Sequence, residues 1–255
     1  MARTSDQSTP ITLSESAGIR YLHFGSPWVQ GAMRVSRPET LVLEYVRQMM
    51  GWLLFLEPPV RILQLGLGAG SLARFTRKYC PQTRITAVEI SSDVIDVACD
   101  WFALSRFDRE LQLVRADAFE FLKRPASRQA FGIVQVDLYD MDALGPTLDT
   151  ARFYRACRDA LREPGICVIN LFGEHHTFEP NIRRIEKAFD GRVLVLPAIP
   201  EGNRVVFAFS GPQLRVGWEQ LTQRGLVLRQ KFGLEADQWV RQIRGISGKG
   251  TEFAI

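Results

Sequence analysis

Residues 61–71 read RILQLGLGAGS, a short apolar run that leads directly into a glycine-rich loop. Gly66, Gly68 and Gly70 let the backbone turn tightly and approach a ligand without interference from a Cβ atom. A dinucleotide fingerprint needs glycine or alanine at position 71, where Ser71 stands. The spacing instead suits an adenosyl sulfonium cofactor, which has no pyrophosphate to hold. This stretch therefore predicts a strand, a nucleoside-binding loop and the start of a helix.

The same alternation continues downstream of this loop. Each of five apolar runs precedes an amphipathic stretch: 61–66 with 70–79, 84–90 with 92–103, 111–116 with 118–123, 131–137 with 149–162, and 165–172 with 179–189. Five successive strand-helix units predict a parallel sheet covered by helices on both faces. Two more runs, at 192–199 and 203–210, are joined by a short turn and predict an antiparallel hairpin at one edge. The expected fold is α/β, with a doubly wound, Rossmann-like sheet of seven strands.

The flanking segments predict a small lobe before the sheet and helices after it. Residues 1–17 are polar and are expected to be frayed, whereas 19–24 and 28–33 predict a β-hairpin. Ser36 and Glu39 form a capping-box pattern, which predicts a helix from there to about Phe55. Helices are also expected around 212–223 and 235–243, before a mobile end at 245–255. We expect a lobe at 1–35 and a nucleoside-binding domain at 36–255.

Composition bounds the function classes. The chain has 255 residues and a net charge of +4, and its arginines are scattered along the sequence. A nucleic-acid partner is therefore not expected. The four cysteines lie far apart without CxxC spacing, which indicates buried thiols in a reducing compartment and no zinc site. Because no long apolar segment or apolar leader occurs, we expect a cytoplasmic protein without a membrane partner or a metal.

Two acidic residues end the second and third predicted strands. Glu89 follows Gly66 by 23 residues, and a carboxylate there can accept hydrogen bonds from both ribose hydroxyls. Asp117 ends the third strand, where it is placed to meet an adenine amino group. Together with the glycine loop, the two acids favour a nucleoside site over a purely structural turn.

Residues 134–146, VQVDLYDMDALGP, place three more acids after the fourth strand. If the sheet starts in the middle with 61–66 and reverses before 131–137, Asp137 and Asp140 face the glycine loop across the crevice where such sheets bind ligands. Negative charge in a partly dry cleft favours binding of an ammonium group. The alternative is an Asx turn and helix cap before 149–162, a role that suits Asp142 and Asp149.

These stretches resemble the spermidine synthases, the polyamine aminopropyltransferase family, from about residue 19 to 210. The resemblance is clearest in RILQLGLGAGS, AVEISSDVIDVACDWF, RADAFEFL and VDLYDMDALGPTLDTARFYRACRDAL. It implies the fold of S-adenosylmethionine-dependent methyltransferases and, usually, a homodimer. Asp140 matches the base that takes a proton from the attacking amine, and Asp137 matches the first aspartate of the same motif. Gly145 and Pro146 match the turn that follows.

The resemblance also implies the residues that bind the cofactor. Glu89 matches the acid that binds the ribose, and Asp117, followed by Ala118, matches the acid on the adenine side. Gln30, in WVQGAM, is similar to a glutamine of the family that contacts the cofactor.

Two departures from the family pattern concern the grip on cations. The family loop is typically Gly-Gly-Gly-Asp-Gly-Gly, and its aspartate holds the amine of the aminopropyl donor; Ala69 stands at that position here. The family's Asp-Glu-x-x-Tyr-x-Glu helix is reduced to Tyr45 followed by Val46 and Arg47. The donor is therefore expected to be either decarboxylated S-adenosylmethionine or S-adenosylmethionine itself.

The main hypothesis is aminopropyl transfer to a small amine, such as a polyamine. Asp140 would accept the proton and Asp137 would orient the ammonium, with Tyr139 or Tyr154 lining the slot. A primary amine has a pKa near about 10.4, so it arrives protonated and needs a base. The alternatives are methyl transfer from S-adenosylmethionine to a small amine and a nucleoside-binding protein that has lost turnover.

Further candidates follow the fifth strand. Asn170 and Glu174 are placed to replace lost contacts to the acceptor. His175 and His176 either line the pocket or lie on a solvated loop.

Overall fold

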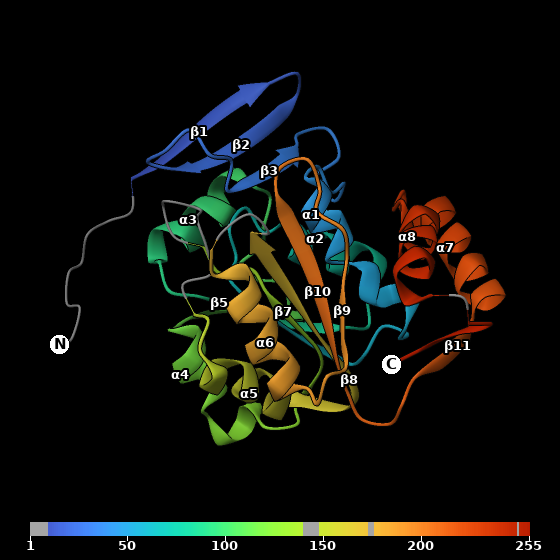
Figure 1. The fold of residues 1–255 in the computed structure, drawn as a ribbon. Helices are drawn as coiled ribbons and strands as arrows, with labels where there is room; N and C mark the ends of the chain where they lie inside the picture. The colour runs from blue at the N-terminus through green and yellow to red at the C-terminus, as the bar shows by residue number, and fades with distance from the viewer. Residues whose placement is uncertain (1–9, 140–147, 173–175, 249) are drawn as a thin grey trace.

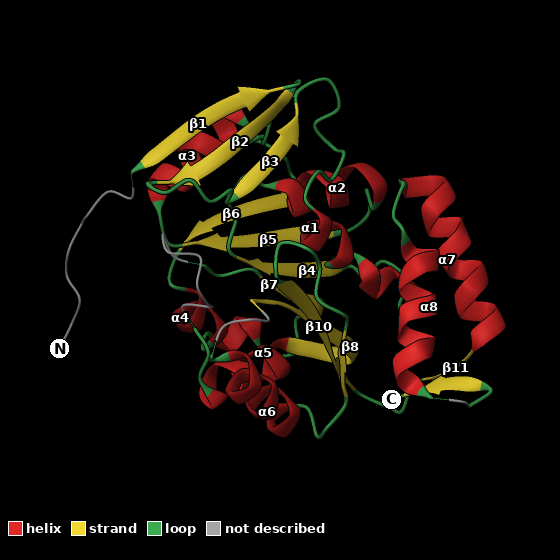
Figure 2. Ribbon diagram, turned by 45° about the horizontal axis from the view of Figure 1, so that its top comes forward, coloured by secondary structure: helices red, strands yellow, loops and turns green. Residues whose placement is uncertain are grey.

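The computed structural model describes residues 10–139, 148–172, 176–248 and 250–255. One large sheet runs through the molecule, with helices on both of its faces and a small second sheet at one end (Figure 1). A pair of helices near the C-terminus packs beside the large sheet (Figure 2).

The large sheet has seven strands in the order β6-β5-β4-β7-β8-β10-β9. The five strands from β6 to β8 in this order are parallel to one another, and β10 is antiparallel to both of its neighbours. Their bounds are β4 (Arg61–Leu65), β5 (Arg84–Glu89), β6 (Leu111–Arg115), β7 (Phe131–Val136), β8 (Leu161–Phe172), β9 (Val193–Val195) and β10 (Asn203–Ser210). The predicted doubly wound sheet and its antiparallel edge hairpin are confirmed. As expected, the first strand of the sheet in the chain is the central strand β4, and the strand order reverses between β4 and β7.

Alternate residues of the central strand feed two hydrophobic layers. Ile62 packs with the core on the side of α1, α7 and α8, whereas Leu63 and Leu65 pack with α4, α5 and α6. This is why the strands are continuous apolar runs and not alternating ones. The helices that cover the sheet are α2 (Ser71–Tyr79), α3 (Ser92–Trp101), α4 (Ala118–Leu122), α5 (Ala151–Ala160), α6 (Phe178–Ala188), α7 (Trp218–Phe232) and α8 (Ala236–Ser247).

The small sheet contains a strand that we did not expect. Its strands β1 (Ile11–Ser16), β2 (Ile19–Phe24) and β3 (Gly31–Arg34) are antiparallel in that order. The hairpin of β2 and β3 was predicted, but residues 11–16 belong to a strand and not to a frayed end. Six residue pairs join β1 to β2, which explains why a largely polar segment is ordered. Leu22 and Met33 pack this sheet against Ala69 of the glycine loop.

The long helix predicted from Ser36 to Phe55 is wrong. Only α1 (Glu44–Gln48) and a 3-10 turn, η1 (Gly51–Leu54), are helical, and no side chain caps the start of α1. Arginine side chains donate hydrogen bonds to backbone carbonyl groups that would accept from backbone amides in a helix. Arg74 Nε donates to Pro38 O at 2.8 Å, and Arg47 Nη1 donates to Val42 O at 2.7 Å. The capping-box pattern is therefore part of an irregular segment over the glycine loop.

The end of the chain is also more ordered than predicted. Residues 245–255 were expected to be mobile, yet β12 (Glu252–Ala254) pairs with β11 (Arg215–Gly217). Phe253 is 2% exposed and packs against Phe55 with ring centroids 5.3 Å apart. One buried aromatic side chain thus anchors the C-terminal strand to the main core.

The predicted burial of the cysteines holds for three of the four, and Cys99 is partly exposed; all four are free thiols. No helix within the described residues has the length and apolar character needed to cross a bilayer.

Candidate functional site

A cavity of about 510 Å³ opens at the carboxyl ends of β4, β5, β6 and β7. It lies beside the point where the strand order reverses, which is where ligands bind in open α/β sheets. Nine of the predicted site residues line it: Gln30, Tyr45, Gly66, Gly68, Glu89, Asp117, Ala118, Asp137 and Tyr139. Apolar side chains of Phe24, Leu67, Ile90, Leu138 and Leu148 complete the wall. Gly70 and Asn170 support this wall from behind without lining the cavity.

Gly66 is the residue that brings the loop and the β7 edge together. Its φ angle is +91°, and an added Cβ atom would lie 2.1 Å from the carbonyl oxygen of Asp137. The Asp137 amide donates to Leu65 O at 2.9 Å, so the two strand ends stay hydrogen-bonded up to the cavity. A side chain at position 66 would separate them. The glycine is therefore required both by backbone conformation and by space.

Glu89 is held in one orientation at the end of β5. Its Oε2 accepts from the backbone N–H of Leu67 at 3.1 Å, and its Oε1 accepts from that of Ser91 at 3.0 Å. Burial raises the pKa of Glu89, and the backbone hydrogen bonds oppose this rise. Each oxygen keeps further lone pairs for a ligand. The carboxylate thus links the glycine loop to β5 and still faces the cavity.

Asp117 has a structural task that we did not predict for it. Its Oδ1 accepts from the backbone N–H of Glu120 at 2.8 Å and caps α4. The cap fixes the side chain at the cavity wall beside Ala118, which is buried. Capping and ligand contact are compatible, because the carboxylate has a second oxygen.

Asp137 is held by two donors from different parts of the chain. Tyr45 Oη donates to its Oδ2 at 3.4 Å, and Asn170 Nδ2 donates to its Oδ1 at 2.9 Å. Asn203 Nδ2 donates in turn to Asn170 Oδ1 at 3.0 Å and fixes the orientation of that amide. Tyr139 Oη donates to Asn170 O at 3.0 Å. A carboxylate, two phenols and two amides therefore form one connected network.

Burial sets the protonation of this network. It raises the pKa of the Asp137 carboxyl, and the hydrogen bonds from Asn170 and Tyr45 act in the opposite direction. Burial and the nearby Asp137 carboxylate raise the pKa of Tyr45 and of Tyr139. Both phenols are therefore donors at neutral pH. A cation that enters the cavity would favour the charged form of Asp137 and lower the pKa of its carboxyl.

Sequence reasoning missed Asn203 and the apolar lining of the cavity. Asn203 reaches Asn170 because β10 is antiparallel to β8, with Val205 opposite Asn170. This register depends on the tertiary fold, and no local pattern marks it. Ile90 could have been predicted to line the cavity, because it directly follows Glu89 at the strand end.

Several predicted residues lie outside the described residues: Asp140, Asp142, Gly145, Pro146, Glu174 and His175. His176 is described and is exposed ahead of α6. Asp149 does not cap α5, because Thr150 Oγ1 accepts from the Phe153 amide at 3.1 Å. Asp149 instead pairs with Arg184 at 3.0 Å. Among the described residues, no cluster of three or more histidine, cysteine or acidic side chains is placed to hold a metal ion.

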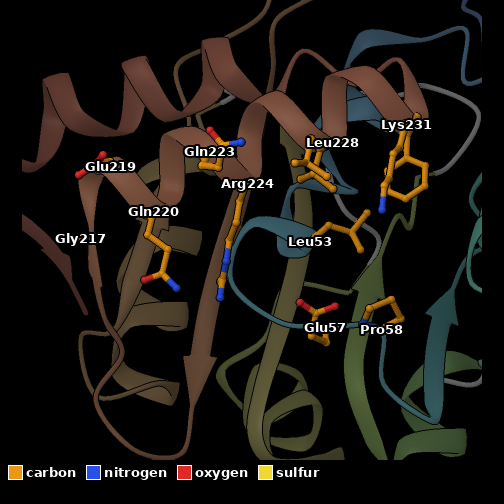
Figure 3. Close-up of a pocket in the computed structure, with 12 residues that line it drawn as sticks. Leu53, Glu57, Pro58, Gly217, Glu219, Gln220, Gln223, Arg224, Leu228 and Lys231 are labelled. Carbon is orange, nitrogen blue, oxygen red and sulfur yellow. The ribbon is translucent and has the colours of Figure 1, made fainter.

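A second, larger groove of about 980 Å³ runs along α7 and contains none of the predicted site residues. Figure 3 shows Gln220 and Arg224 extending from α7 toward the loop that carries Glu57 and Pro58. Arg224 Nη1 donates to Leu54 O at 3.0 Å, so this arginine ties α7 to η1. We therefore assign the groove no part in the chemistry.

Comparisons with known proteins identify a family over most of the chain. A family model described as the spermine/spermidine synthase domain matches residues 42–211. The polyamine aminopropyltransferase of Neisseria meningitidis is 38% identical over 226 residues, which cover 88% of this chain and 85% of that protein. The enzyme of the same name from Chromobacterium violaceum is 36% identical over 234 residues, which cover 92% and 89%.

A solved structure shares the fold over most of the chain. The probable spermidine synthase from Corynebacterium glutamicum superposes with a TM-score of 0.69 at 18% identity, covering 91% of this chain and 88% of that one. The family match spans the glycine loop, Glu89 and the Asp137 network, and two relatives exceed 35% identity over most of their length. The chain therefore belongs to the spermine/spermidine synthase family.

Proposed function

We propose that the protein transfers an aminopropyl group from decarboxylated S-adenosylmethionine to a small amine acceptor of the polyamine class. The observation that carries the proposal is the Asp137 carboxylate, fixed by Asn170 and Tyr45 at the wall of a nucleoside-sized cavity. Family membership and the two polyamine aminopropyltransferases support the same reaction.

The nucleoside of the donor binds to the residues at the ends of β4, β5 and β6. Glu89 accepts hydrogen bonds from the ribose hydroxyls. The backbone amides of Leu67 and Ser91 each donate to one of its oxygens and so fix the carboxylate in place for this contact. Asp117 accepts from the adenine amino group with the oxygen that does not cap α4. Gly66, Gly68 and Gln30 lie along the same wall, and Gly70 shapes the turn into α2.

The acceptor amine binds at Asp137, and the acid Asp140 of the same motif serves as its base. A sulfonium is already an activated electrophile, so the enzyme has to align the amine with the S–C bond and remove its proton. Asp140 takes this proton, Asp137 orients the ammonium, and Tyr139 lines the slot. The lone pair of the amine nitrogen forms the new C–N bond while the S–C bond breaks. The electron pair of the S–C bond stays with sulfur, and the product methylthioadenosine leaves.

Methyl transfer from intact S-adenosylmethionine is the second candidate. Ala69 favours it, because this side chain cannot hold the terminal amine of the donor as the family's aspartate does. Family membership outweighs this single position. We also propose that the protein works as a homodimer in the cytoplasm, as the family resemblance implies.

Isothermal titration with three ligands separates the candidates. Decarboxylated S-adenosylmethionine, S-adenosylmethionine and methylthioadenosine are titrated in parallel into the purified protein. We expect the decarboxylated donor to bind most tightly and to support product formation with a diamine. Tighter binding of intact S-adenosylmethionine would favour methyl transfer, and failure of all three ligands to bind would refute the nucleoside site.

A further inference from the structure

A small side cavity extends from the candidate site toward the centre of the sheet. Its volume is about 20 Å³, room for one water-sized group such as a primary ammonium. It shares Gln30, Tyr45, Gly66, Gly68 and Asp137 with the large cavity, so the two are continuous. Its inner wall adds the side chains of Gln64, Ala69 and Ser71.

Gln64 is an unusual residue for its position. It lies in the central strand β4 and is 2% exposed, whereas the residues on either side of it in the strand are leucines. Burial of a polar side chain costs free energy unless hydrogen bonds compensate for it. A buried amide at the inner wall of a cavity therefore calls for a partner on each of its two polar atoms.

A chain of hydrogen bonds determines which way this amide points. Met49 O can only accept, so Gln135 donates to it with Nε2, at 3.4 Å. The Oε1 of Gln135 then faces Gln64, which donates its own Nε2 at 3.2 Å. The acceptor that remains on Gln64 is Oε1. Strand pairing supports this geometry, because Gln64 and Gln135 are opposite each other in β4 and β7.

Ala69 adds nothing polar to the same cavity. It is 3% exposed, and an ideal Cβ atom built on Gly31 of β3 would lie 2.5 Å from its methyl group. The small sheet therefore packs directly against the methyl group of Ala69. Gln64 and Asp137 both line the side cavity, and each carries an oxygen that can accept a hydrogen bond from a cation.

We propose that Gln64 is a specificity-determining residue, whose Oε1 accepts a hydrogen bond from the terminal ammonium of the aminopropyl donor in place of the acid missing at position 69. This inference rests on the proposed function and assigns the terminal ammonium of the donor to the side cavity. Two acceptors facing one small space favour an ammonium group and disfavour a carboxylate. The site therefore selects the decarboxylated donor over intact S-adenosylmethionine.

Three variants test the role of Gln64. Gln64→Leu removes both polar atoms at similar volume, Gln64→Glu supplies a charged acceptor, and Gln135→Met removes the partner that orients Gln64. Each variant and the wild type are titrated with decarboxylated S-adenosylmethionine and with methylthioadenosine, which lacks the aminopropyl ammonium. The ratio of the two dissociation constants isolates the contribution of the ammonium.

For Gln64→Leu, we expect the dissociation constant of the decarboxylated donor to rise about tenfold to hundredfold, the usual effect of losing a hydrogen bond to a charged group. The value for methylthioadenosine should stay within about twofold. Gln64→Glu should bind the donor more tightly than the wild type does, and Gln135→Met should cause a smaller loss, because the amide of Gln64 is then free to turn.

An equal loss for both ligands, or no loss for either, would overturn the proposal. If Gln64→Leu does not fold, the comparison of Gln64→Glu with the wild type decides, since an added charge that leaves donor affinity unchanged also overturns it. Titration of a diamine into the methylthioadenosine complex provides a further check. A loss confined to the diamine would assign Gln64 to the acceptor and refute the donor role. The proposed function itself is tested before any variant is made, by comparing the affinities of the wild type for decarboxylated and for intact S-adenosylmethionine.

Discussion

At the scale of single residues, folding and binding place opposite requirements on Asp137: burial favours its neutral form, whereas binding of an ammonium needs its charged form. Burial raises the pKa of its carboxyl, whereas Asn170 and Tyr45 stabilise the charged form. A folded-state pKa above the ordinary value means that the folded chain binds the proton more strongly than the unfolded chain does. The contribution of Asp137 to stability is therefore greatest at low pH and is lost as pH rises through the raised pKa.

Asp137→Asn separates these demands. Asparagine keeps the bond from Asn170, and the Tyr45 oxygen can accept from the new amide. We expect kcat/KM for aminopropyl transfer to fall by about 10²-fold or more, because an ammonium loses its charged partner. The free energy of unfolding should increase relative to the wild type, and more so at pH 8 than at pH 5. Steady-state kinetics and urea unfolding at both pH values measure the two effects.

Asp159→Asn is the matched control for this substitution, since Asp159 is exposed on α5. Its activity and stability should equal those of the wild type. Full activity of Asp137→Asn would remove Asp137 from the site.

Glu89→Gln tests the ribose contact. The amide would place an N–H group against the backbone N–H of Leu67 or of Ser91, which both donate to the carboxylate. We expect the dissociation constant of methylthioadenosine to rise about tenfold to hundredfold, as measured by isothermal titration. Glu110→Gln, at a surface ion pair with Arg84, should leave binding unchanged. Equal affinities for the two variants would argue against a ribose contact at Glu89.

At the scale of elements, α4 shows how one side chain can both cap a helix and line a cavity. Asp117 caps the helix with Oδ1, lines the cavity and has a second oxygen available to a ligand. Mutation to alanine would remove both contributions and would give an ambiguous result. A substitution that preserves the cap is needed to separate them.

Asp117→Asn provides this separation, because asparagine caps helices about as well as aspartate does. The free energy of unfolding should change by no more than about 0.5 kcal/mol. Affinity for methylthioadenosine should fall about tenfold, because an NH₂ group cannot accept from the adenine amino group. Methylthioinosine, which carries a keto oxygen at that position, should lose less affinity or gain some. Unchanged affinity for both nucleosides would restrict Asp117 to capping.

The strands could be predicted from the sequence, and the irregular segments could not, for physical reasons. Strands buried on both faces are mostly apolar, so their ends and the acids at those ends are visible in the sequence. The segment at 36–43 is shaped by Arg74 and Arg47, which bind its carbonyl groups from elsewhere in the fold. Asn203 and Gln64 act through strand register, and a local pattern does not reveal register.

At the scale of the whole molecule, the C-terminal strand closes the core on the side of α7 and α8. Phe253 contacts rings from three separate parts of the chain: Phe55, Phe209 and Trp218. Glu252 pairs with Arg215 at 2.7 Å beside it. This packing lies away from the candidate site, because Phe253 does not line the large cavity.

Phe253→Ala should therefore affect stability far more than chemistry. We expect a loss of about 3–5 kcal/mol in the free energy of unfolding, the usual cost of truncating a buried phenylalanine. The affinity of the folded fraction for methylthioadenosine should stay within about twofold. Urea unfolding and isothermal titration give the two values. Phe107→Ala is the control, because Phe107 is 92% exposed and should change stability by less than about 0.5 kcal/mol.

The late position of Phe253 in the chain has a consequence for biosynthesis. Synthesis proceeds from the N-terminus at about 5–20 residues per second, and all strands of the large sheet lie before residue 211. The sheet and the nucleoside cavity are thus translated before the strand that covers Phe55 and Phe209. A nascent chain exposes these rings until Phe253 leaves the ribosomal tunnel. Emergence of Phe253 from the tunnel, and not completion of the large sheet, is therefore the step that covers these two rings.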